Sequence, residues 1–514
     1  MPKFRCARTK CEAIITNVIA PYAQRLVDDE MTEVSYVTVL TDASNKGSTK
    51  MFPVLVRYFV PTEGVRIKIA DFCTTKGETS EIISELIKTT AKNRNFAEKV
   101  VAFCADNCPT NFGSKQRGGQ NNVFFRLKLW IPALLGIGCA AHITHSALKS
   151  ACDELPIDIE LVVVKIYSHF YIYTVRVEKL KNICEMEGVE YKKLLGYAKT
   201  RFLALGPAIA RILELFDPLK TYFLKVKGET FLKKFFNDSM SKLWLVFVKE
   251  QAEAFKETVL SIEGENICAP DVAFQLEQLR ASIILRKDEN YFSPTMESEI
   301  QALHDSGEFS EKSFNAASSC FYDAASDYLL EWTDQFEDLR TLLWIGLRAT
   351  PTWPNLNASM KFVSLRDKTF DVDVVSPKLF VQFGFLKNYC SGEKISEWDK
   401  QGTPTEDRWV EVFRMMMADK IPFVELGKIV QFILCLPGTS AAVERIFSLI
   451  NNLWKSESSN LHVNTLRAIL LVKCNLTFSC TEFHKLLKSD KDLIQQVSGH
   501  EKYAFKASSK SETN

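Results

Sequence analysis

The chain has 514 residues, of which 46% are hydrophobic and 25% are charged, and its net charge is +1. This composition excludes a disordered or fibrous chain and suits a globular protein of two or three domains. The near-zero net charge excludes a field over the whole protein that would attract nucleic acid or a membrane, so any basic surface has to be local. Its 14 cysteines follow no apolar N-terminal leader, which favours a reducing compartment over a disulfide framework. Since no apolar run is long enough to span a bilayer, we expect no membrane partner.

The N-terminal part of the chain predicts a sheet. Apolar and β-branched runs indicate four strands, which cover residues 34–41, 51–60, 65–73 and 99–105. A helical lead-in over residues 1–33 precedes them, and an amphipathic helix over 79–93 separates the third strand from the fourth. The first strand is expected to deliver Asp42 to a turn, and the fourth ends at Asp106. Two strands that are not neighbours in the sequence therefore each end in an aspartate.

Three strands, a helix and a fourth strand is the order expected of a ribonuclease-H-like sheet, in which the first and fourth strands lie side by side. Their ends would then present Asp42 and Asp106 together. Such a pair suits hydrolysis or transfer at a phosphodiester, because two Mg²⁺ ions about 4 Å apart can neutralise the attacking and leaving oxygens. These hard cations take carboxylate oxygens as ligands. A third carboxylate has to come from elsewhere in the chain.

Residues 134–142 indicate a fifth strand that leads into a helix over 143–152. Cys139, His142 and His145 together suggest a metal site, but the sequence offers no second cysteine pair at ligand spacing. The favoured alternative is a packed cysteine and a hydrogen-bonded histidine at the junction between strand and helix. We therefore expect no zinc.

From about residue 155 to 430 the pattern is mainly helical, without an internal repeat. Charge is uneven within this region, since residues 217–242 interleave lysines with aromatic residues and acids dominate from Glu289 to Asp338. The first segment suits a nucleic-acid backbone. Its alternative is an amphipathic helix pair with lysines on the wet face and aromatic rings in the core. The acidic segment is expected to face solvent or a basic partner.

A further helix is expected to begin after Pro437, with Thr439 or Ser440 as its N-cap. Apolar residues recur on one of its faces, and these are Val443, Phe447, Ile450 and Trp454. Glu444 lies off that face, so its carboxylate would be held at a defined position and stay available. The alternative is a solvated first-turn glutamate that the helix dipole favours.

Six short motifs carry a resemblance to a known family. They are Leu40-Thr41-Asp42, Cys104-Ala105-Asp106-Asn107, Cys139-Ala140-Ala141-His142, Thr200-Arg201-Phe202, the segment from Pro437 to Phe447, and the segment from Leu466 to Leu471. Together they resemble hAT-superfamily DNA transposases and proteins derived from them, over roughly residues 30–476. In such proteins a ribonuclease-H-like core is interrupted by a large helical insertion, and a final catalytic helix returns to the sheet.

The resemblance implies an α/β fold with a mixed ribonuclease-H-like sheet and a large all-helical insertion domain. The expected parts are a lead-in at 1–33, the first part of the core at 34–154, the insertion at 155–430, the catalytic-type helix with the dimerisation region at 431–476, and a tail at 477–514.

The resemblance also assigns residue roles. Asp42, Asp106 and Glu444 would be the catalytic and metal-binding triad, with Mg²⁺ or Mn²⁺ as the cofactor. Arg201 and Phe202 would contact DNA, where the ring would stack on a flipped base; the family usually has Trp in place of Phe. DNA is the implied partner, a homodimer or higher homo-oligomer the implied assembly, and the nucleus the implied location.

Two functions stay open at this point. In the first, the protein cleaves and transfers DNA strands in a metal-dependent reaction. In the second, it is a catalytically inactive derivative that acts as a dimeric scaffold or chromatin factor and self-associates through the apolar segment 420–475. The three acids favour the first function. The Phe202 change favours the second, as does the lack, ahead of residue 34, of the zinc finger that relatives usually carry.

Overall fold

A computed structural model describes residues 7–46, 49–113, 119–196, 205–264, 267–454 and 461–503 of the chain. The chain divides into two compact units. Unit 1 comprises Met1–Cys139, Glu265–Asp271 and Asp338–Asn514, and unit 2 comprises Ala140–Gly264 and Val272–Glu337. This division differs from the domain boundaries expected from the sequence, because the helices between residues 338 and 430 belong to the unit that contains the sheet.

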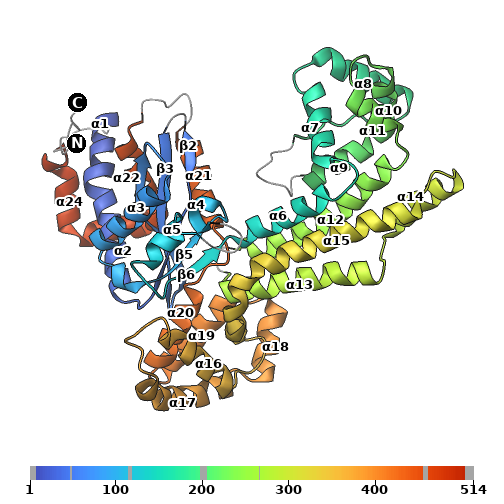
Figure 1. Ribbon diagram of the computed structural model, residues 1–514. Helices are drawn as coiled ribbons and strands as arrows, with labels where there is room; N and C mark the ends of the chain where they lie inside the picture. The colour runs from blue at the N-terminus through green and yellow to red at the C-terminus, as the bar shows by residue number, and fades with distance from the viewer. Residues whose placement is uncertain are drawn as a thin grey trace. The chain divides into compact units, whose positions relative to one another are not determined.

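Unit 1 is built around a mixed sheet of six strands (Figure 1). The strands are β1 Val37–Thr41, β2 Ser44–Lys46, β3 Thr49–Val60, β4 Gly64–Thr75, β5 Val100–Ala105 and β6 Leu135–Gly138. β3 pairs antiparallel with β4 on one side and with β1 and β2 on the other. β1, β5 and β6 run parallel to one another. The predicted strands are confirmed, and so is the expectation that the first and the fourth of them are neighbours.

β1 ends at Thr41, as expected, and a second strand, β2, begins at Ser44. β1 and β2 pair with the same strand, β3, in one continuous register. That register places Asp42 opposite Pro53. Because proline has no backbone N–H, the hydrogen-bond ladder is interrupted there and resumes at the start of β2. The predicted strand end is therefore confirmed, and a two-residue gap followed by β2 takes the place of the expected turn at Asp42.

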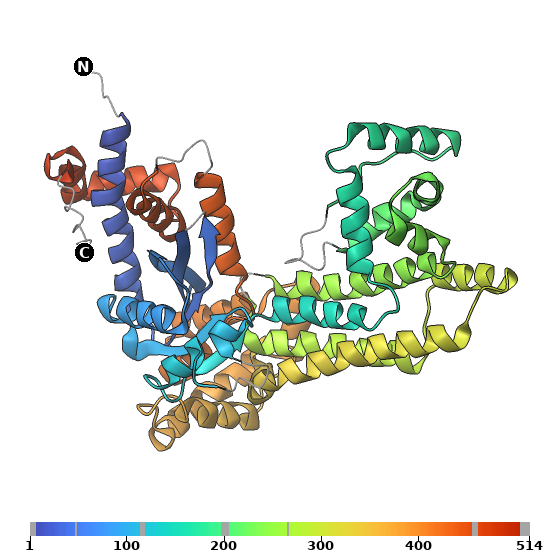
Figure 2. The ribbon, with the colours of Figure 1, turned by 45° about the horizontal axis from the view of Figure 1, so that its top comes forward.

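Helices flank the sheet of unit 1 on both faces (Figure 2). Those that precede residue 130 are α1 Arg8–Ile14, the π-helical turn η1 Ile15–Ile19, α2 Ala20–Thr32, α3 Ser80–Asn93, the 3₁₀ turn η2 Ala97–Lys99, α4 Pro109–Phe112 and α5 Val123–Lys128. Apolar side chains of α2, α3, α4 and α5 form a core with Val39, Val54 and Phe103 of the strands. Local signals explain the helix starts: the Thr79 hydroxyl and the Asn122 side chain accept backbone N–H groups at the first turns of α3 and α5.

The later part of unit 1 is helical. Its helices are α16 Trp353–Ser364, α17 Val372–Tyr389, α18 Gly392–Gln401, α19 Thr405–Ala418, α20 Val424–Leu434, α21 Ala441–Leu453, α22 Val463–Asn475, α23 Cys480–Ser489, α24 Lys491–Ser498 and the 3₁₀ turn η6 Glu501–Tyr503. α20 and α21 pack against β3, and α22 packs against β4 and α2. The expected tail thus contains two further helices.

The apolar segment 420–475 is part of the core of unit 1. Ile429 and Ile433 of α20, Val443 of α21, and Leu466 and Leu470 of α22 have no exposed surface. These five side chains are therefore packed inside the unit, whereas Val424, in the same segment, is 62% exposed.

Unit 2 is entirely helical in its described residues. Its helices are α6 Ala140–Asp153, α7 Ile159–Phe170, α8 Thr174–Met186, α9 Leu205–Glu214, α10 Phe216–Lys225, α11 Thr230–Asn237, α12 Ser241–Ile262, α13 Ala269–Asp288, α14 Pro294–Asp305 and α15 Glu311–Thr333, after which the 3₁₀ segment η4 Asp334–Gly346 leads back to unit 1. α6, α12 and α15 pack side by side. Aromatic residues fill their interface, where the ring centroids of Trp244 and Phe314 are 4.9 Å apart.

The aromatic residues of segment 217–242 belong to this core. Phe223 and Phe236 are buried and stack with their centroids 5.5 Å apart, while Lys220 and Lys225 are exposed. The amphipathic helix pair is thus the correct interpretation of this segment, and its buried rings are not available to bases. None of the helices within the described ranges is long and apolar enough to cross a membrane.

Candidate functional site

The two aspartates predicted from the strand ends are neighbours in the sheet. β1 and β5 are adjacent and parallel, and Leu40 pairs with Cys104. Asp42 and Asp106 each follow two residues later. Adjacent strands lie about 4.8 Å apart, so the two carboxylates leave the same edge of the sheet side by side. Both residues are partly buried.

The aspartates lie on the face of the sheet that α20 covers. Side chains alternate along a strand, so Asp42 shares a face with Thr38. The Thr38 hydroxyl lies 3.7 Å from Cys435 Sγ, directly after α20. Arg57, which pairs with Thr38 on β3, is 2% exposed and donates from Nε to the carbonyl oxygen of Leu434 at 3.2 Å. This buried guanidinium therefore binds the C-terminal end of α20 to the sheet.

The carboxylate of Asp106 is oriented by the loop that follows β5. Its Oδ1 accepts from Asn111 Nδ2 at 2.6 Å and from the backbone N–H of Cys108 at 3.4 Å. Burial, together with the charge of Asp106, raises the pKa of the Cys108 thiol to about 12. Cys108 is therefore protonated near neutral pH and acts as a further donor toward the carboxylate.

Cys139 links the end of the sheet to the start of α21. Its N–H donates to Ala105 O at 3.0 Å, and its carbonyl oxygen accepts from Asn107 Nδ2 at 2.9 Å. Its Sγ accepts from the N–H of Ser440 at 3.3 Å. One fully buried residue thus joins the end of β5, the residue after Asp106 and the first turn of the helix that carries Glu444.

α21 begins without the side-chain cap expected from the sequence. Ser440 occupies the N-cap position, but its hydroxyl accepts no backbone N–H, and the Thr439 hydroxyl accepts only from the N–H of Ala441 at 3.4 Å. The predicted N-cap position is therefore confirmed at Ser440, although its side chain makes no capping hydrogen bond. The N–H of Ser440 donates to Cys139 Sγ, which ties the start of the helix to the end of the sheet.

Glu444 lies in the first turn of α21 and is partly buried. A cavity of about 1070 Å³ on this face is lined by Ile67 and Ile69 of β4 and by Ala442 and Ile446 of α21. Glu444 is two residues from each of these helix positions, which is more than half a turn around the helix. Its side chain therefore starts from the side of α21 that faces away from the cavity.

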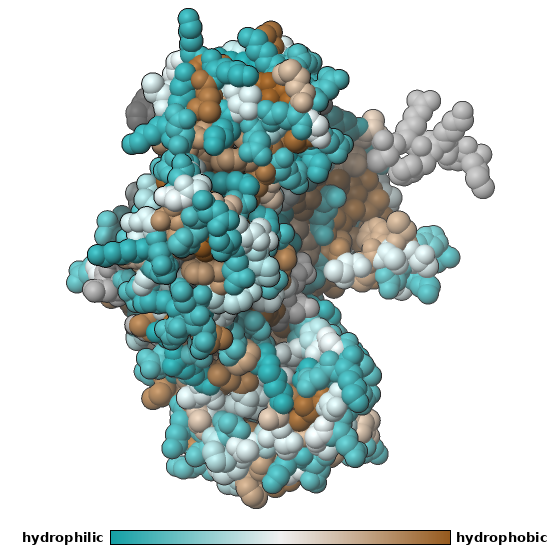
Figure 3. Space-filling view, turned by 90° about the vertical axis from the view of Figure 1, so that its right-hand side faces the viewer, coloured by the Kyte–Doolittle hydropathy of each residue, from teal (hydrophilic) through white to brown (hydrophobic). Residues whose placement is uncertain are grey.

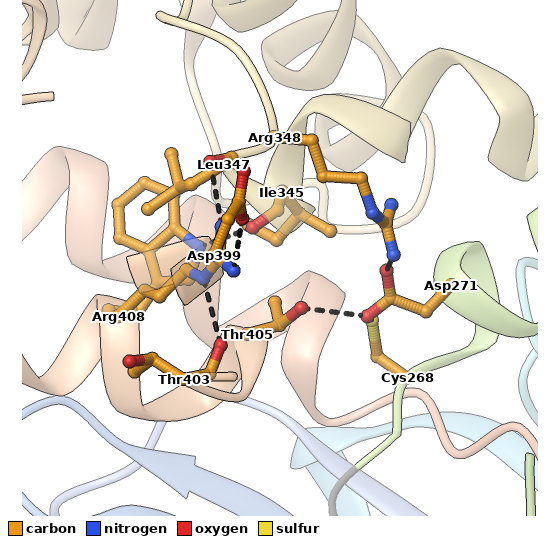
Figure 4. Close-up of polar contacts among 10 residues, drawn as sticks. Cys268, Asp271, Ile345, Leu347, Arg348, Asp399, Thr403, Thr405 and Arg408 are labelled. Carbon is orange, nitrogen blue, oxygen red and sulfur yellow. Dashed lines mark hydrogen bonds and ion pairs between the residues drawn. The ribbon is translucent and has the colours of Figure 1, made fainter. Parts of the chain in front are cut away.

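A short brace holds the chain just ahead of α21. Cys268 forms an isolated antiparallel bridge with Pro437, and the N–H of Ala269 donates to Leu436 O at 3.0 Å. Asp271, 4% exposed, anchors this brace by accepting from Arg348 at 2.5 Å and from the Thr405 hydroxyl at 3.0 Å (Figure 4).

The same junction is reinforced by Arg408, which Figure 4 shows beside the brace. Its guanidinium donates to Thr403 O at 2.9 Å, to Leu347 O at 3.1 Å and to Asp399 Oδ1 at 2.7 Å. Two backbone carbonyls and one carboxylate are thus tied to a single buried cation, which stiffens the segment that carries Arg348.

The donor atoms at the strand ends suit a hard divalent cation. Besides the two carboxylates, Asn107 Oδ1 and Ser440 Oγ are buried and have no hydrogen-bond partner among the described residues. Oxygen ligands of this kind are those that Mg²⁺ takes in proteins. Within the described ranges, however, no three His, Cys, Asp or Glu side chains are grouped so that they could hold one metal ion. The convergence of Asp42, Asp106 and Glu444 on a cation therefore stays a prediction.

The other predicted site residues are divided between the two units or fall outside the described structure. His142 and His145 are on α6, in unit 2, whereas Cys139 belongs to unit 1. Arg201 and Phe202 fall in segment 197–204, outside the described residues.

Sequence reasoning did not assign Arg57 or Asn111 to the site, and it named Asn107 and Ser440 only as a motif residue and an N-cap. The two asparagines could have been found, because they follow Asp106 in the same polar loop. Arg57 gave no signal, since a single arginine in an apolar strand is compatible with an exposed edge.

The chain matches no model of a known protein family, and no curated protein matches it.

Proposed function

We propose that this protein is a hAT transposase-like enzyme that cleaves and transfers DNA strands at a metal-dependent, ribonuclease-H-like site formed by Asp42, Asp106 and Glu444. The observation that carries the proposal is that Leu40 pairs with Cys104 on adjacent parallel strands, and that Asp42 and Asp106 each follow two residues later. They lie on the face of the sheet against which the helix with Glu444 packs.

The topology of unit 1 supports this proposal. The strand order β4-β3-β1-β5-β6, with an antiparallel hairpin on one side and three parallel strands on the other, is the order expected of a ribonuclease-H-like sheet. The chain leaves the sheet after β6, passes through unit 2 and the helices α16 to α20, and comes back to β3 with α21. This path matches a core interrupted by a helical insertion.

In this proposal each side chain has a defined task. The carboxylates of Asp42, Asp106 and Glu444 would hold the divalent cations, which supply charge neutralisation on the attacking and leaving oxygens of the phosphodiester. Asn111 fixes the orientation of the Asp106 carboxylate. Cys139 holds the first turn of α21 at the end of the sheet, which limits how far Glu444 can move from the aspartates.

The second candidate is a catalytically inactive scaffold that self-associates through the apolar segment 420–475. Many apolar side chains of this segment are buried in unit 1, whereas Val424 is 62% exposed. This burial, together with the two aspartates at the strand ends, favours the enzyme over the scaffold.

The test is a nicking assay on hairpin-forming DNA with Mg²⁺, Mn²⁺ or EDTA. The full chain is compared with Asp42→Asn, Asp106→Asn and Glu444→Gln, which preserve side-chain shape. Glu81→Gln is the matched control, because Glu81 is a first-turn glutamate on α3. We expect metal-dependent nicking by the wild type and by the control, and loss of at least a hundredfold in each site variant. Equal nicking by all proteins would refute the proposal.

A further inference from the structure

The corner between α7 and α8 exposes two tyrosines and two aliphatic side chains in five residues. Tyr171 is 67% exposed, Ile172 69%, Tyr173 47% and Val175 67%. Figure 3 shows hydrophobic residues as separate patches on a largely hydrophilic face of the molecule, so an apolar run of this density needs an explanation. We call Tyr171, Ile172, Tyr173, Val175 and Arg176 the tyrosine platform.

The platform is held in place by buried contacts. The guanidinium of Arg176 lies 3.9 Å above the ring of Tyr173 and donates to the carbonyl oxygen of His169 at 3.0 Å. His169 is 7% exposed and is itself fixed by Glu229 at 3.0 Å and by the Tyr222 hydroxyl at 3.1 Å. The orientation of Arg176, and through it that of Tyr173, therefore depends on the core of unit 2.

Tyr171 is supported in a similar way. Its ring centroid is 5.1 Å from that of Tyr167, one helical turn earlier. Most of the ring nevertheless remains open to solvent. Two aromatic rings, each backed by a neighbouring side chain, are thus presented on one corner of the unit.

The charge around the platform favours an anionic occupant. Between residues 155 and 237 lysine and arginine outnumber aspartate and glutamate, although the whole chain is nearly neutral. Lys165 and Lys179, on the two helices that meet at the corner, are exposed, and Lys181 is partly buried beside them. Glu178 on α8 is paired with Lys181 at 2.7 Å, and Glu229 lies 3.0 Å from His169 Nδ1, which Arg176 also contacts at 3.3 Å. Exposed rings among basic residues suit unpaired bases, because each ring can stack on a base while the cations contact the backbone.

We infer that the tyrosine platform binds single-stranded nucleic acid. Tyr171 and Tyr173 stack on unpaired bases, and Arg176 contributes its charge. A duplex is bound more weakly at this corner, because the faces of its bases are already stacked on one another. The inference rests on the proposed function in so far as an enzyme that cuts and rejoins DNA handles strands with unpaired ends.

The test uses fluorescence anisotropy of a labelled 20-nucleotide single strand, a duplex of the same length, and the full chain in EDTA, so that no cleavage is needed. Tyr171→Ala/Tyr173→Ala is expected to weaken single-strand binding tenfold or more, since a lost aromatic stack costs about one order of magnitude in affinity. Tyr171→Phe/Tyr173→Phe keeps the rings and is expected to retain binding.

The matched control is Tyr291→Ala. Tyr291 is 53% exposed and has Arg286 at 5.9 Å from its ring, but it lies in the acidic part of the chain. Equal affinity of wild type and the double alanine variant, or an equal loss in the Tyr291 variant, would overturn the inference. So would a change of oligomeric state in the double alanine variant with unchanged DNA affinity, because the platform would then be a protein interface. Loss of binding in the platform variant together with absence of nicking in Mg²⁺ would support this inference while refuting the proposed enzyme.

Discussion

Replacing Asp271 by Asn removes the anchor of the brace ahead of α21. The Asp271 side chain is 6% exposed, and its oxygens accept from Arg348 at 2.5 Å, from the Thr405 hydroxyl at 3.0 Å and from the Cys268 thiol at 3.3 Å. An amide keeps one acceptor oxygen and turns an NH₂ group toward one of these donors. A buried donor without an acceptor costs about 1–3 kcal/mol.

The loss of the ion pair with Arg348 adds less to the destabilisation than its short distance suggests. The side chain of Arg348 is 43% exposed, so water screens its charge and takes over part of its hydration. We therefore expect a total local destabilisation of about 2–3 kcal/mol, most of it from the unsatisfied donors. This corresponds to about a 30- to 150-fold increase in the population of the locally open state.

Hydrogen exchange read by mass spectrometry measures this effect, because unfolding of a chain with two units is not a two-state process. Exchange should accelerate in peptides that contain Ala269, whose N–H is bonded to Leu436, and in those that cover the start of α21. Asp288→Asn is the matched control, since Asp288 is an exposed aspartate at the end of the same helix. Unchanged exchange at Ala269 in the Asp271 variant would refute the view that Asp271 anchors the brace.

Three further predictions concern the sheet edge and the two units. Cys139→Ala leaves the N–H of Ser440 without its acceptor and should lower the stability of unit 1 by about 1–3 kcal/mol. Cys139→Ser keeps an acceptor and should lower the stability less. Urea titration of both variants measures the difference. Burial lowers the pKa of His169 below its ordinary value of 6.5, so the unfolded chain takes up the proton more readily and unit 2 should lose stability as the pH falls below about 6.5. His169→Gln should weaken this dependence of the urea midpoint on pH. The same dependence in the wild type and in the variant would contradict the role of His169. Leu470→Ala, at a position with no exposed surface, should destabilise unit 1 by about 2–5 kcal/mol without changing the sedimentation coefficient of the folded protein; dissociation of an oligomer would contradict the placement of segment 420–475 in the core.

The strands and the pairing of their ends could be predicted from the sequence because the signals are local. Runs of β-branched residues mark β1 and β5, and each run stops at an aspartate. A helix between two strands makes a parallel crossover the natural connection, and parallel neighbours present the same ends at the same edge. The position of Asp42 beside Asp106 follows from these rules.

The residues that follow Asp42 show where such rules stop. Asp42-Ala43-Ser44-Asn45 has the composition of a turn, and its own residues give no reason to continue the strand. What extends the strand is a partner, since β3 goes on past Pro53 and pairs with β2 in the same register. The turn-like composition after Asp42 therefore corresponds to a gap in the pairing with β3, and this pairing resumes in β2.

The position of α21 was the part least accessible to sequence reasoning, and it decides whether Glu444 can act with the aspartates. It depends on contacts between residues that are distant in sequence: the N–H of Ser440 donates to Cys139 Sγ, the N–H of Ala269 to Leu436 O, and the buried Arg57 Nε to Leu434 O. Each of these contacts uses a backbone group, and backbone N–H and C=O groups are the same in almost every residue. The pattern of side chains therefore could not predict them. The long excursion through unit 2 is tolerated because the entropy of closing a loop grows only slowly with its length, and a few such contacts can hold its return. The resemblance could name Glu444, and these contacts explain how a helix more than three hundred residues after β5 stays against β3, the neighbour of β1.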